Sequence, residues 1–389
     1  MPATSEFCAV LDALVPDLFS VLGLLSGALA VLAVGCVLRI SSQSVKRAAR
    51  QLFTEHGLHG ADVGSRTKRL VSETAKVLTT RGRDAEKAPG VVAAALHQLG
   101  FGVEKTQLTQ YLLFVGSDAV TLLADFCEDN WDPIVEAVDK AAAENKSTKD
   151  SASGPAKISK VKPSKEIQAA AKRIFDATRA ADIAMFGRMI ADNTDFNVAA
   201  ASQVAHALST HAVATEFDFY TAVDDLKRDD EPGADMIGTV DFNTACYYRY
   251  ANLDLDQLRR NLEGDDELVA RAAQAWLGAF VHATPGGKQP STAARTMPET
   301  LLGTVRTRGA WNLANAFLRP VSGTDLLGAS SERLFTHFQS LRGFYGSSEL
   351  RAVAGAALSC GTDPLPAEDV VIGLDEFSSR LLTTAQESA

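Results

Sequence analysis

Apolar residues recur at helical spacing soon after the first forty residues of the chain. They stand at positions i, i+3, i+4, i+7 and i+8, and they are Val45, Ala48, Ala49, Leu52 and Phe53. This spacing is typical of one buried helix face. Ser41 and Ser42 come directly before it, and serine hydroxyls commonly cap the free amides of a helix start. The pattern therefore predicts an amphipathic helix that begins near Ser42.

Helical patterning continues to about residue 142 and resumes after residue 165. Residues 140–165 between these stretches are rich in Lys, Ser and Ala and have almost no large apolar side chain. Such a composition cannot bury a core. We therefore expect a mostly helical region that a flexible segment interrupts at 140–165.

The hydrophobic period changes to two in the stretch from 236 to 253. Its even positions are largely apolar, and they include Met236, Val240, Phe242, Cys246, Tyr248 and Tyr250. This alternation is typical of a half-buried strand. Residues 210–226 also have strand composition, and a polar turn-forming segment, "KRDDEPGAD", joins the two. The pattern predicts a long hairpin and, with helices near 255–262, 265–283, 329–341 and 374–384, an α+β fold.

Composition narrows the classes of function. The 389 residues are 46% hydrophobic and suffice for two domains or one large elaborated domain. A formal net charge of −10 argues against nonspecific coating of DNA, so any nucleic-acid contact must be local. Five scattered cysteines without a CxxC pair favour reduced thiols over a disulfide framework or a zinc site.

Positive charge gathers at the start of the first predicted helix. Arg39, Lys46, Arg47 and Arg50 fall within thirteen residues, and Lys46 and Arg50 share one helix face. A capped helix start already carries partial positive charge, so an anion such as phosphate would remove the electrostatic conflict. A solvated basic helix face is the alternative from this stretch alone.

Three further stretches carry candidate binding residues, each beside an ordinary structural alternative. "GSRTKRL" adds Arg66 and Lys68, which either extend the basic surface or lie in a solvated turn. "PGGKQP" presents Lys288 in a glycine loop, although it fails the phosphate-loop pattern. Residues 247–250, "YYRY", either form a base-stacking surface or fill a sheet face.

Metal-dependent chemistry is not expected. The acidic and histidine side chains near the hairpin have unsuitable spacing for a metal site; they are His206, His211, Glu216, Asp218, Asp224 and Asp225. The GxSxG pattern of a serine nucleophile is absent from the sequence. We expect no metal, no cofactor and no catalytic residue.

The motifs taken together resemble the CasC family, the repeated backbone subunit of the type I-E CRISPR Cascade surveillance complex. The resemblance runs from about residue 38 to at least 321. The stretches that carry it, in the order of the family, are "RISSQSVKRAAR", "RTKRL", "ADIAMFGRM", "QVAHALSTHAV", "FDFYTAVDDL", "GTVDFNTACYYRYANLDLDQLRRNLEGD", "PGGKQ" and "NLANAFLRPV".

The resemblance implies a palm like an RNA-recognition motif, with a helical fingers insertion and a β-hairpin thumb. The palm would start at 38–50. The fingers would occupy 51–180, with 140–165 flexible. The palm would continue over 181–321 and contain the thumb at about 213–246. A helical, palm-packing C-terminal region would follow at 322–389.

It also implies a function. Copies of the chain would form a filament along one CRISPR RNA with other Cascade subunits, and the guide would pair with target DNA. The backbone of the RNA would be held by Ser41, Ser42, Gln43, Lys46, Arg47 and Arg50. Met189 would be the wedge beside a displaced nucleotide, and the apolar thumb residues packed there would be Tyr220, Thr221, Val223 and Ile237. The subunit would be non-catalytic and cytoplasmic, with no membrane contact.

The N-terminus departs from the family. Residues 1–37 lack its Asn-Arg-Asp segment and Gly-Gly turn, and Phe19–Leu38 form an uncharged stretch long enough to span a membrane. We favour a shifted reading frame or a wrong start, in which case the first palm strand is missing. The alternative is a genuine segment that inserts in a membrane.

Two other functions stay open beside the RNA scaffold. One is a membrane-anchored protein of unknown role, which rests on the N-terminal stretch alone. The other is an RNA-cleaving backbone subunit that uses an aspartate of the thumb loop. The residues for that role would be Asp224, Asp225 or Asp229.

Overall fold

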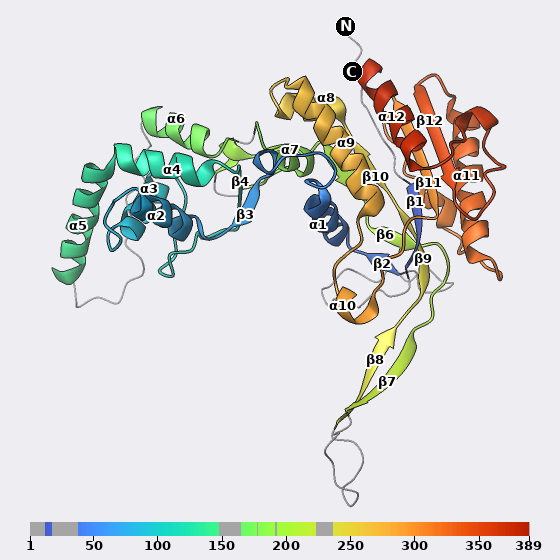
Figure 1. Ribbon diagram of the computed structural model, residues 1–389, viewed down its shortest axis with the longest axis horizontal. Coiled ribbons are helices and arrows are strands. Elements are labelled where there is room, and N and C mark those ends of the chain that lie inside the picture. The colour runs from blue at the N-terminus through green and yellow to red at the C-terminus, as the bar shows by residue number, and fades with distance from the viewer. Residues whose placement is uncertain are drawn as a thin grey trace, which may run out of the picture. The chain divides into compact units, whose positions relative to one another are not determined.

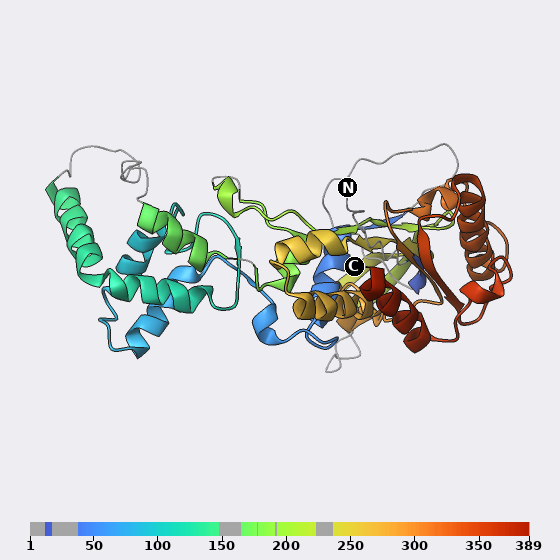
Figure 2. The ribbon, with the colours of Figure 1, turned by 90° about the horizontal axis from the view of Figure 1, so that it is seen from above.

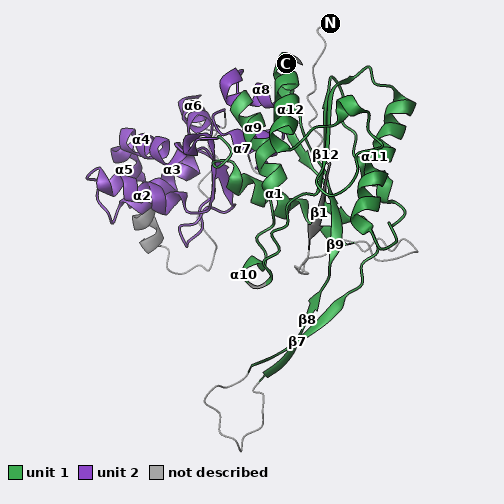
Figure 3. Cartoon of the chain, turned by 45° about the vertical axis from the view of Figure 1, so that its right-hand side comes forward, with its two compact units in different colours: residues 1–57, 202–256, 270–389 green, residues 58–201, 257–269 purple. Residues whose placement is uncertain are grey.

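The computed structural model describes residues 12–17, 38–147, 165–176, 178–190, 193–222 and 236–388. The chain divides into two compact units, which Figure 3 distinguishes by colour. Unit 1 comprises residues 1–57, 202–256 and 270–389, and unit 2 comprises 58–201 and 257–269. The fold combines helices and strands, as the sequence predicted.

Unit 1 is built on a six-stranded sheet in the order β12-β11-β1-β9-β6-β2, and every neighbouring pair is antiparallel. The strands are β1 (Asp12–Asp17), β2 (Arg39–Ile40), β6 (Ala207–Ser209), β9 (Ala245–Arg249), β11 (Thr300–Arg306) and β12 (Leu350–Ala357). A separate two-stranded sheet pairs β5 (Ser202–Val204) with β10 (Ala251–Leu253).

The expectation that the first strand is missing was wrong. Residues 12–17 form β1, which lies between β9 and β11 and pairs with both. Backbone pairing depends little on side-chain identity, and without β1 two inner strands would leave rows of polar groups unpaired. A strand can therefore occupy this position without the family's usual motif. The predicted membrane stretch, residues 19–38, lies outside the described residues except for Leu38.

Among the residues that the structure describes, no helix has both the length and the apolar character needed to cross a membrane.

Helices cover both faces of the unit 1 sheet. On one face lie α1 (Ser42–Leu52), α9 (Asp266–His282) and α12 (Leu374–Ser388), and on the other lie α11 (Leu326–Tyr345) and η3 (Leu313–Phe317). In Figure 2, α11 and α12 flank the strands between them on opposite sides. The shorter helical elements of unit 1 are α10 (Gln289–Thr292) and η4 (Ala367–Asp369).

The stretch from 236 to 253 is three strands instead of the single half-buried strand that its alternation predicted. β8 (Met236–Phe242) does alternate between exposed and half-buried positions from Gly238 onward. In β9, by contrast, Ala245 to Tyr248 are all buried. The prediction failed in β9 because both faces of that strand are covered, so no solvated face imposes a polar alternation.

A long hairpin extends beyond the sheet of unit 1, as Figure 1 shows. Its strands β7 (Glu216–Ala222) and β8 pair in antiparallel register from Glu216↔Phe242 to Ala222↔Met236. The predicted pairing of these two segments is therefore present. The tip, residues 223–235, lies outside the described residues.

Unit 2 is mostly helical around a large apolar core, with a second, small apolar cluster beside β4. Its helices are α2 (Leu70–Thr80), α3 (Ala88–Gln98), α4 (Ala119–Asp129), α5 (Trp131–Ser147), α6 (Lys165–Ile174) and α7 (Ala181–Phe186), with short helical turns η1 (Gly60–Asp62) and η2 (Thr194–Phe196). A small ribbon pairs β3 (Ser65–Thr67) with β4 (Leu113–Val115). The helix α8 (Leu255–Asn261) contributes residues to both units.

The predicted flexible segment began too early. Helix α5 continues through residues 140–147, and Lys140 forms an i,i+4 ion pair of 2.8 Å with Glu136. The run Ala141–Ala143 explains the extension, because alanine has the highest helix propensity. The remainder of the predicted segment, up to residue 164, lies outside the described residues.

We predict that Gly303→Val destabilises the protein by about 1–3 kcal/mol, the usual range for overpacking. A Cβ at Gly303 in β11 would lie 2.3 Å from Leu381 Cδ1 and 2.8 Å from Phe377 Cζ of α12. Both partners are fully buried, so they can give way only by displacing their neighbours in the core. Gly343→Ala is the control, because its Cβ meets nothing within 4 Å. Denaturant unfolding in which both variants match the wild type would contradict the packing of α12 on β11.

Candidate nucleic-acid interface

The start of α1 presents a capped and basic surface. Strand β2 leads into Ser41, whose hydroxyl accepts a hydrogen bond of 3.3 Å from the Gln43 amide. This confirms the predicted cap at Ser41. The first turn contains no acidic residue. The helix therefore offers its partial positive end without a carboxylate of its own in that turn to neutralise it.

The predicted contact residues of α1 lie on its accessible side. Ser41, Gln43 and Arg47 are exposed, while Ser42, Lys46 and Arg50 are half-buried. The opposite side is fixed in the core, because Val45, Ala48, Ala49 and Phe53 are buried as the apolar stripe predicted. Burial of that stripe holds the polar and basic face in one orientation. Such a face can bind phosphate groups without reading a base sequence.

Arg66 lies within β3 and Lys68 directly follows that strand in unit 2, and both already contact neighbours there. The Arg66 guanidinium lies 4.6 Å from the centroid of the Phe114 ring, its cross-strand partner. Lys68 Nζ donates to the Gln110 carbonyl at 3.2 Å and is 3.8 Å from a Glu104 carboxylate oxygen. An anion at Lys68 would therefore compete with Glu104, which the sequence pattern did not reveal.

Met189 lies on a hydrogen-bonded loop of unit 2. Its side chain is 86% exposed, although Arg188 and Ile190 on either side of it are buried. The backbone of Arg188 exchanges two hydrogen bonds with Val198, of 3.0 and 2.8 Å. The Ile190 amide donates to Asn197 Oδ1 at 2.6 Å. An exposed large apolar side chain on so ordered a segment is typical of a contact surface.

The Arg188 side chain anchors this loop from inside. Its guanidinium donates to three main-chain carbonyls, at 3.1, 2.8 and 2.8 Å, those of Phe114, Phe175 and Phe196. Burial lowers the pKa of the Arg188 guanidinium from its ordinary value, and the nearby Asp176 carboxylate opposes that shift. Gly187 precedes it with φ of 75°, and a Cβ there would lie 2.9 Å from the Val198 carbonyl oxygen. Only glycine fits at a position with this backbone angle and this close to the Val198 carbonyl.

The hairpin carries the other predicted apolar contacts, with Val223 outside the described residues. Tyr220 is 44% exposed, Ile237 is 71% exposed, and Thr221 is also exposed. Tyr220 and Gly238 are cross-strand partners, and a Cβ at Gly238 would lie 2.4 Å from the tyrosine ring. The ring therefore covers the glycine, which fixes the tyrosine across the hairpin.

Sequence reasoning missed three hairpin residues. Phe217, Phe219 and Met236 are also exposed. Cross-strand register places Phe217, Phe219 and Ile237 on one face of the hairpin and Tyr220 and Met236 on the other. The alternation of "EFDFYTA" could have revealed this, because its apolar residues occupy both parities.

The base-stacking hypothesis for residues 247–250 was wrong. Tyr247 and Tyr248 are 0% and 1% exposed, and Tyr250 is buried as well. The Tyr248 hydroxyl donates to Asn312 Oδ1 at 3.0 Å and accepts from the Leu313 amide at 2.8 Å. Arg249 donates to the carbonyls of Ala283 and Phe280 at the end of α9. These side chains fill the sheet faces.

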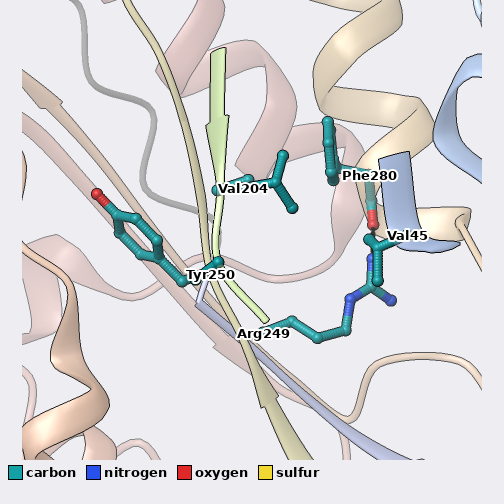
Figure 4. A pocket seen from close by; sticks show the side chains of 7 residues that line it. Val45, Val204, Arg249, Tyr250 and Phe280 are labelled. Atoms are coloured by element: carbon teal, nitrogen blue, oxygen red, sulfur yellow. Dashed lines mark hydrogen bonds between the residues drawn. The ribbon is translucent and has the colours of Figure 1, made fainter. Parts of the chain in front are cut away.

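A small cavity lies beside Arg249. Figure 4 shows the guanidinium of Arg249 reaching toward Phe280 and Val45, with Val204 and Tyr250 also lining the space. Its volume of about 10 Å³ is room for about one water molecule. It cannot hold a nucleotide.

Lys288 is exposed at the start of the four-residue helix α10, with left-handed backbone at φ of 53°. The Gln289 side chain closes the loop by donating to the carbonyls of Pro285 and Ala294, at 3.1 and 2.7 Å. The loop is therefore ordered by its own polar contacts. Lys288 belongs to unit 1, as do α1 and the hairpin, whereas Arg66, Lys68 and Met189 belong to unit 2.

Within the described part of the chain, no three or more His, Cys, Asp or Glu side chains are grouped so that they could hold a metal ion. The candidate aspartates Asp224, Asp225 and Asp229 lie outside that part.

Comparisons with solved structures find chains of CRISPR complexes. One chain, from a "CRISPR RNA-guided surveillance complex, pre-nicking", is 27% identical with a TM-score of 0.78, and the match covers 97% of this chain and 100% of that chain. Another, from a "CRISPR RNA-guided surveillance complex", is 23% identical with a TM-score of 0.67 and shares the fold, over 97% of this chain and 99% of that chain. No curated protein matches.

The family described as CT1975-like protein matches residues 36–376, which leaves the atypical N-terminus outside the match. The match covers most of the chain and contains every candidate residue discussed above. The chain therefore belongs to the CT1975-like protein family, and the resemblance to CasC that its motifs predicted is confirmed.

Proposed function

We propose that the chain is a non-catalytic backbone subunit of a type I-E Cascade complex and binds CRISPR RNA. The observation that carries the proposal is the capped, basic face of α1 in a CT1975-like chain. Its similarity to chains of RNA-guided surveillance complexes supports RNA as the anion that this face holds. The subunit works in the cytoplasm without a membrane anchor.

The order of elements supports a palm like an RNA-recognition motif. Along the chain, β1, α1, β6, β9, α9 and β11 follow one another, and the four strands lie side by side as β11-β1-β9-β6. This is the β-α-β-β-α-β arrangement of that class of fold. Unit 2 is inserted mainly between α1 and β6 and serves as the fingers, and the hairpin between β6 and β9 serves as the thumb.

The grip on RNA is electrostatic and independent of sequence. Ser41 and Ser42 offer hydroxyl groups, the helix start offers its partial positive charge, and Lys46, Arg47 and Arg50 offer full positive charge. An acidic protein needs only this local face to hold phosphates. Contacts to the RNA backbone leave the bases available for pairing with target DNA.

The exposed apolar residues act between copies in a filament. Met189 lies beside the nucleotide that is displaced at regular intervals, and the hairpin of a neighbouring copy presses there with Tyr220, Thr221 and Ile237. Val223 belongs to the same contact. Large apolar groups that add nothing to the core of their own chain are stabilised when a partner covers them.

We predict that Lys46→Ala and Arg50→Ala each weaken binding of single-stranded CRISPR RNA. Each phosphate group that a variant no longer binds should reduce the slope of log K against log salt by about 0.7. Arg308→Ala is the matched control, because Arg308 is an exposed cation on the loop after β11. Titrations at several salt concentrations give the slopes. Slopes and affinities equal to those of the Arg308 variant would remove α1 from the RNA site.

We predict that Tyr220→Ala with Ile237→Ala leaves monomer stability within about 1 kcal/mol of the wild type, because both side chains are exposed. The same variant should form shorter assemblies on RNA, since its hairpin no longer covers the neighbouring site. Leu358→Ala with Ile372→Ala is the control pair, exposed in unit 1 outside the hairpin. Denaturant melts and size analysis of RNA-bound assemblies test this, and a large stability loss with normal assembly would refute the thumb role.

We predict no cleavage of labelled RNA or DNA by the purified protein in Mg²⁺ or Mn²⁺, because the proposed role is to bind RNA and involves no cleavage of a covalent bond. Asp224→Ala and Asp229→Ala test the loop aspartates, with Asp363→Ala as an exposed acidic control. Cleavage that disappears only in the loop variants would establish the RNA-cleaving alternative.

A further inference from the structure

The chain leaves the sheet at a defined point to form the hairpin. Strands β6 and β9 pair through Leu208↔Tyr248 and Ser209↔Tyr247. The Thr210 amide then donates to the Cys246 carbonyl at 2.9 Å, which extends the ladder by one position. Beyond this point the two segments continue into β7 and β8.

The reciprocal hydrogen bond of this last position is replaced. In an antiparallel ladder, two residues that form a hydrogen-bonded pair exchange both N–H···O bonds. Here the Thr210 carbonyl instead accepts from the Val321 amide at 2.9 Å, and His211 forms a parallel bridge with Val321. The first leg of the hairpin thus changes partner, and the Cys246 amide is left without its ladder acceptor.

The His211 side chain takes the place of that acceptor. Its Nε2 accepts from the Cys246 amide at 3.0 Å, and its Nδ1 lies 2.8 Å from the Ala212 carbonyl oxygen. A carbonyl oxygen can only accept, so Nδ1 carries the proton and Nε2 is the free acceptor. The two contacts are mutually consistent only in the neutral Nδ1–H form of the imidazole. The residue is buried, so no solvent replaces this contact.

Further polar contacts tie the same point to its surroundings. The Ser330 hydroxyl of α11 donates to the Leu326 carbonyl at 2.6 Å, and its oxygen lies 2.9 Å from Thr210 Oγ1, which lies 3.3 Å from the Cys246 carbonyl oxygen. The Ser209 hydroxyl donates to the His211 carbonyl at 3.0 Å. A buried and satisfied polar network of this kind favours one geometry strongly over others.

We propose that His211 is the positioning residue of the hairpin: its imidazole joins the two legs where the ladder is broken and so sets the direction in which the hairpin leaves the sheet. The inference rests on the proposed function, in which the hairpin must reach a neighbouring copy. An apolar side chain at 211 leaves the Cys246 amide unsatisfied and the two legs less firmly joined.

The direct test is hydrogen exchange of the Cys246 amide in ¹⁵N-cysteine-labelled protein without RNA. His211→Leu should exchange about five- to tenfold faster, as expected when one ordinary hydrogen bond is removed. His211→Asn should show the same faster exchange as His211→Leu, because the shorter asparagine amide does not reach Cys246. It replaces His211→Leu in the test if the leucine variant does not fold. His211→Gln should restore much of the protection, because its side-chain amide oxygen can accept a hydrogen bond from the Cys246 amide.

His206→Leu is the matched control, since His206 is exposed in the same segment. Exchange of the Cys127 amide in unit 2 should stay unchanged, which would show that the effect is confined to unit 1.

The second readout is assembly on CRISPR RNA, measured as copies bound per RNA, beside the affinity of the first copy. His211→Leu or His211→Asn should reduce the number of copies with first-copy affinity unchanged, and His211→Gln should recover it. Unchanged Cys246 exchange, or faster exchange with normal assembly, would overturn the positioning role. A wild-type protein that does not assemble on RNA would overturn the proposed function, and the exchange measurement on RNA-free protein separates that failure from a failure at His211.

Discussion

Burial of β9 on both faces and both edges is the constraint on which unit 1 depends. Its backbone pairs with β1 and β6, while Tyr247 and Tyr248 fill opposite faces of the sheet. The hydroxyl of Tyr248 is hydrogen-bonded to both Asn312 and Leu313. Side chains therefore cover both faces of β9, and the nucleic-acid contact that we propose lies at the start of α1.

Both units display apolar side chains on elements whose backbones are firmly held. Met189 in unit 2 is exposed because Arg188 beside it is buried against three carbonyls. The hairpin of unit 1 keeps Tyr220 in place over Gly238 while its neighbours remain accessible. An ordered backbone reduces the entropy cost when a partner covers such a side chain. This arrangement is the basis of the contacts between copies that we propose.

Much of this organisation could be predicted from sequence, because local physics specifies it. The apolar stripe of α1 and the serine cap need only neighbouring residues, and both are present. The pairing of β7 with β8 also follows from two strand-forming runs around a polar turn. The family motifs likewise reside in the chain itself, and they indicate the family without the tertiary structure.

Other features depended on residues far apart in the chain. The apolar alternation in 236–253 predicted a strand with one solvated face. Both faces of β9 are nevertheless buried, because elements distant in sequence cover the strand on either side. The presence of β1 follows from two strand edges that are distant in sequence. The positive charge of Lys68 is partly neutralised by Glu104, a contact that its sequence motif does not contain. His211 was only a poorly spaced metal candidate in the sequence. Its role emerged because Val321, more than a hundred positions away, takes the Thr210 carbonyl and leaves Cys246 in need of an acceptor. Periodicity and capping are local, and hydrogen-bond satisfaction across a sheet is not.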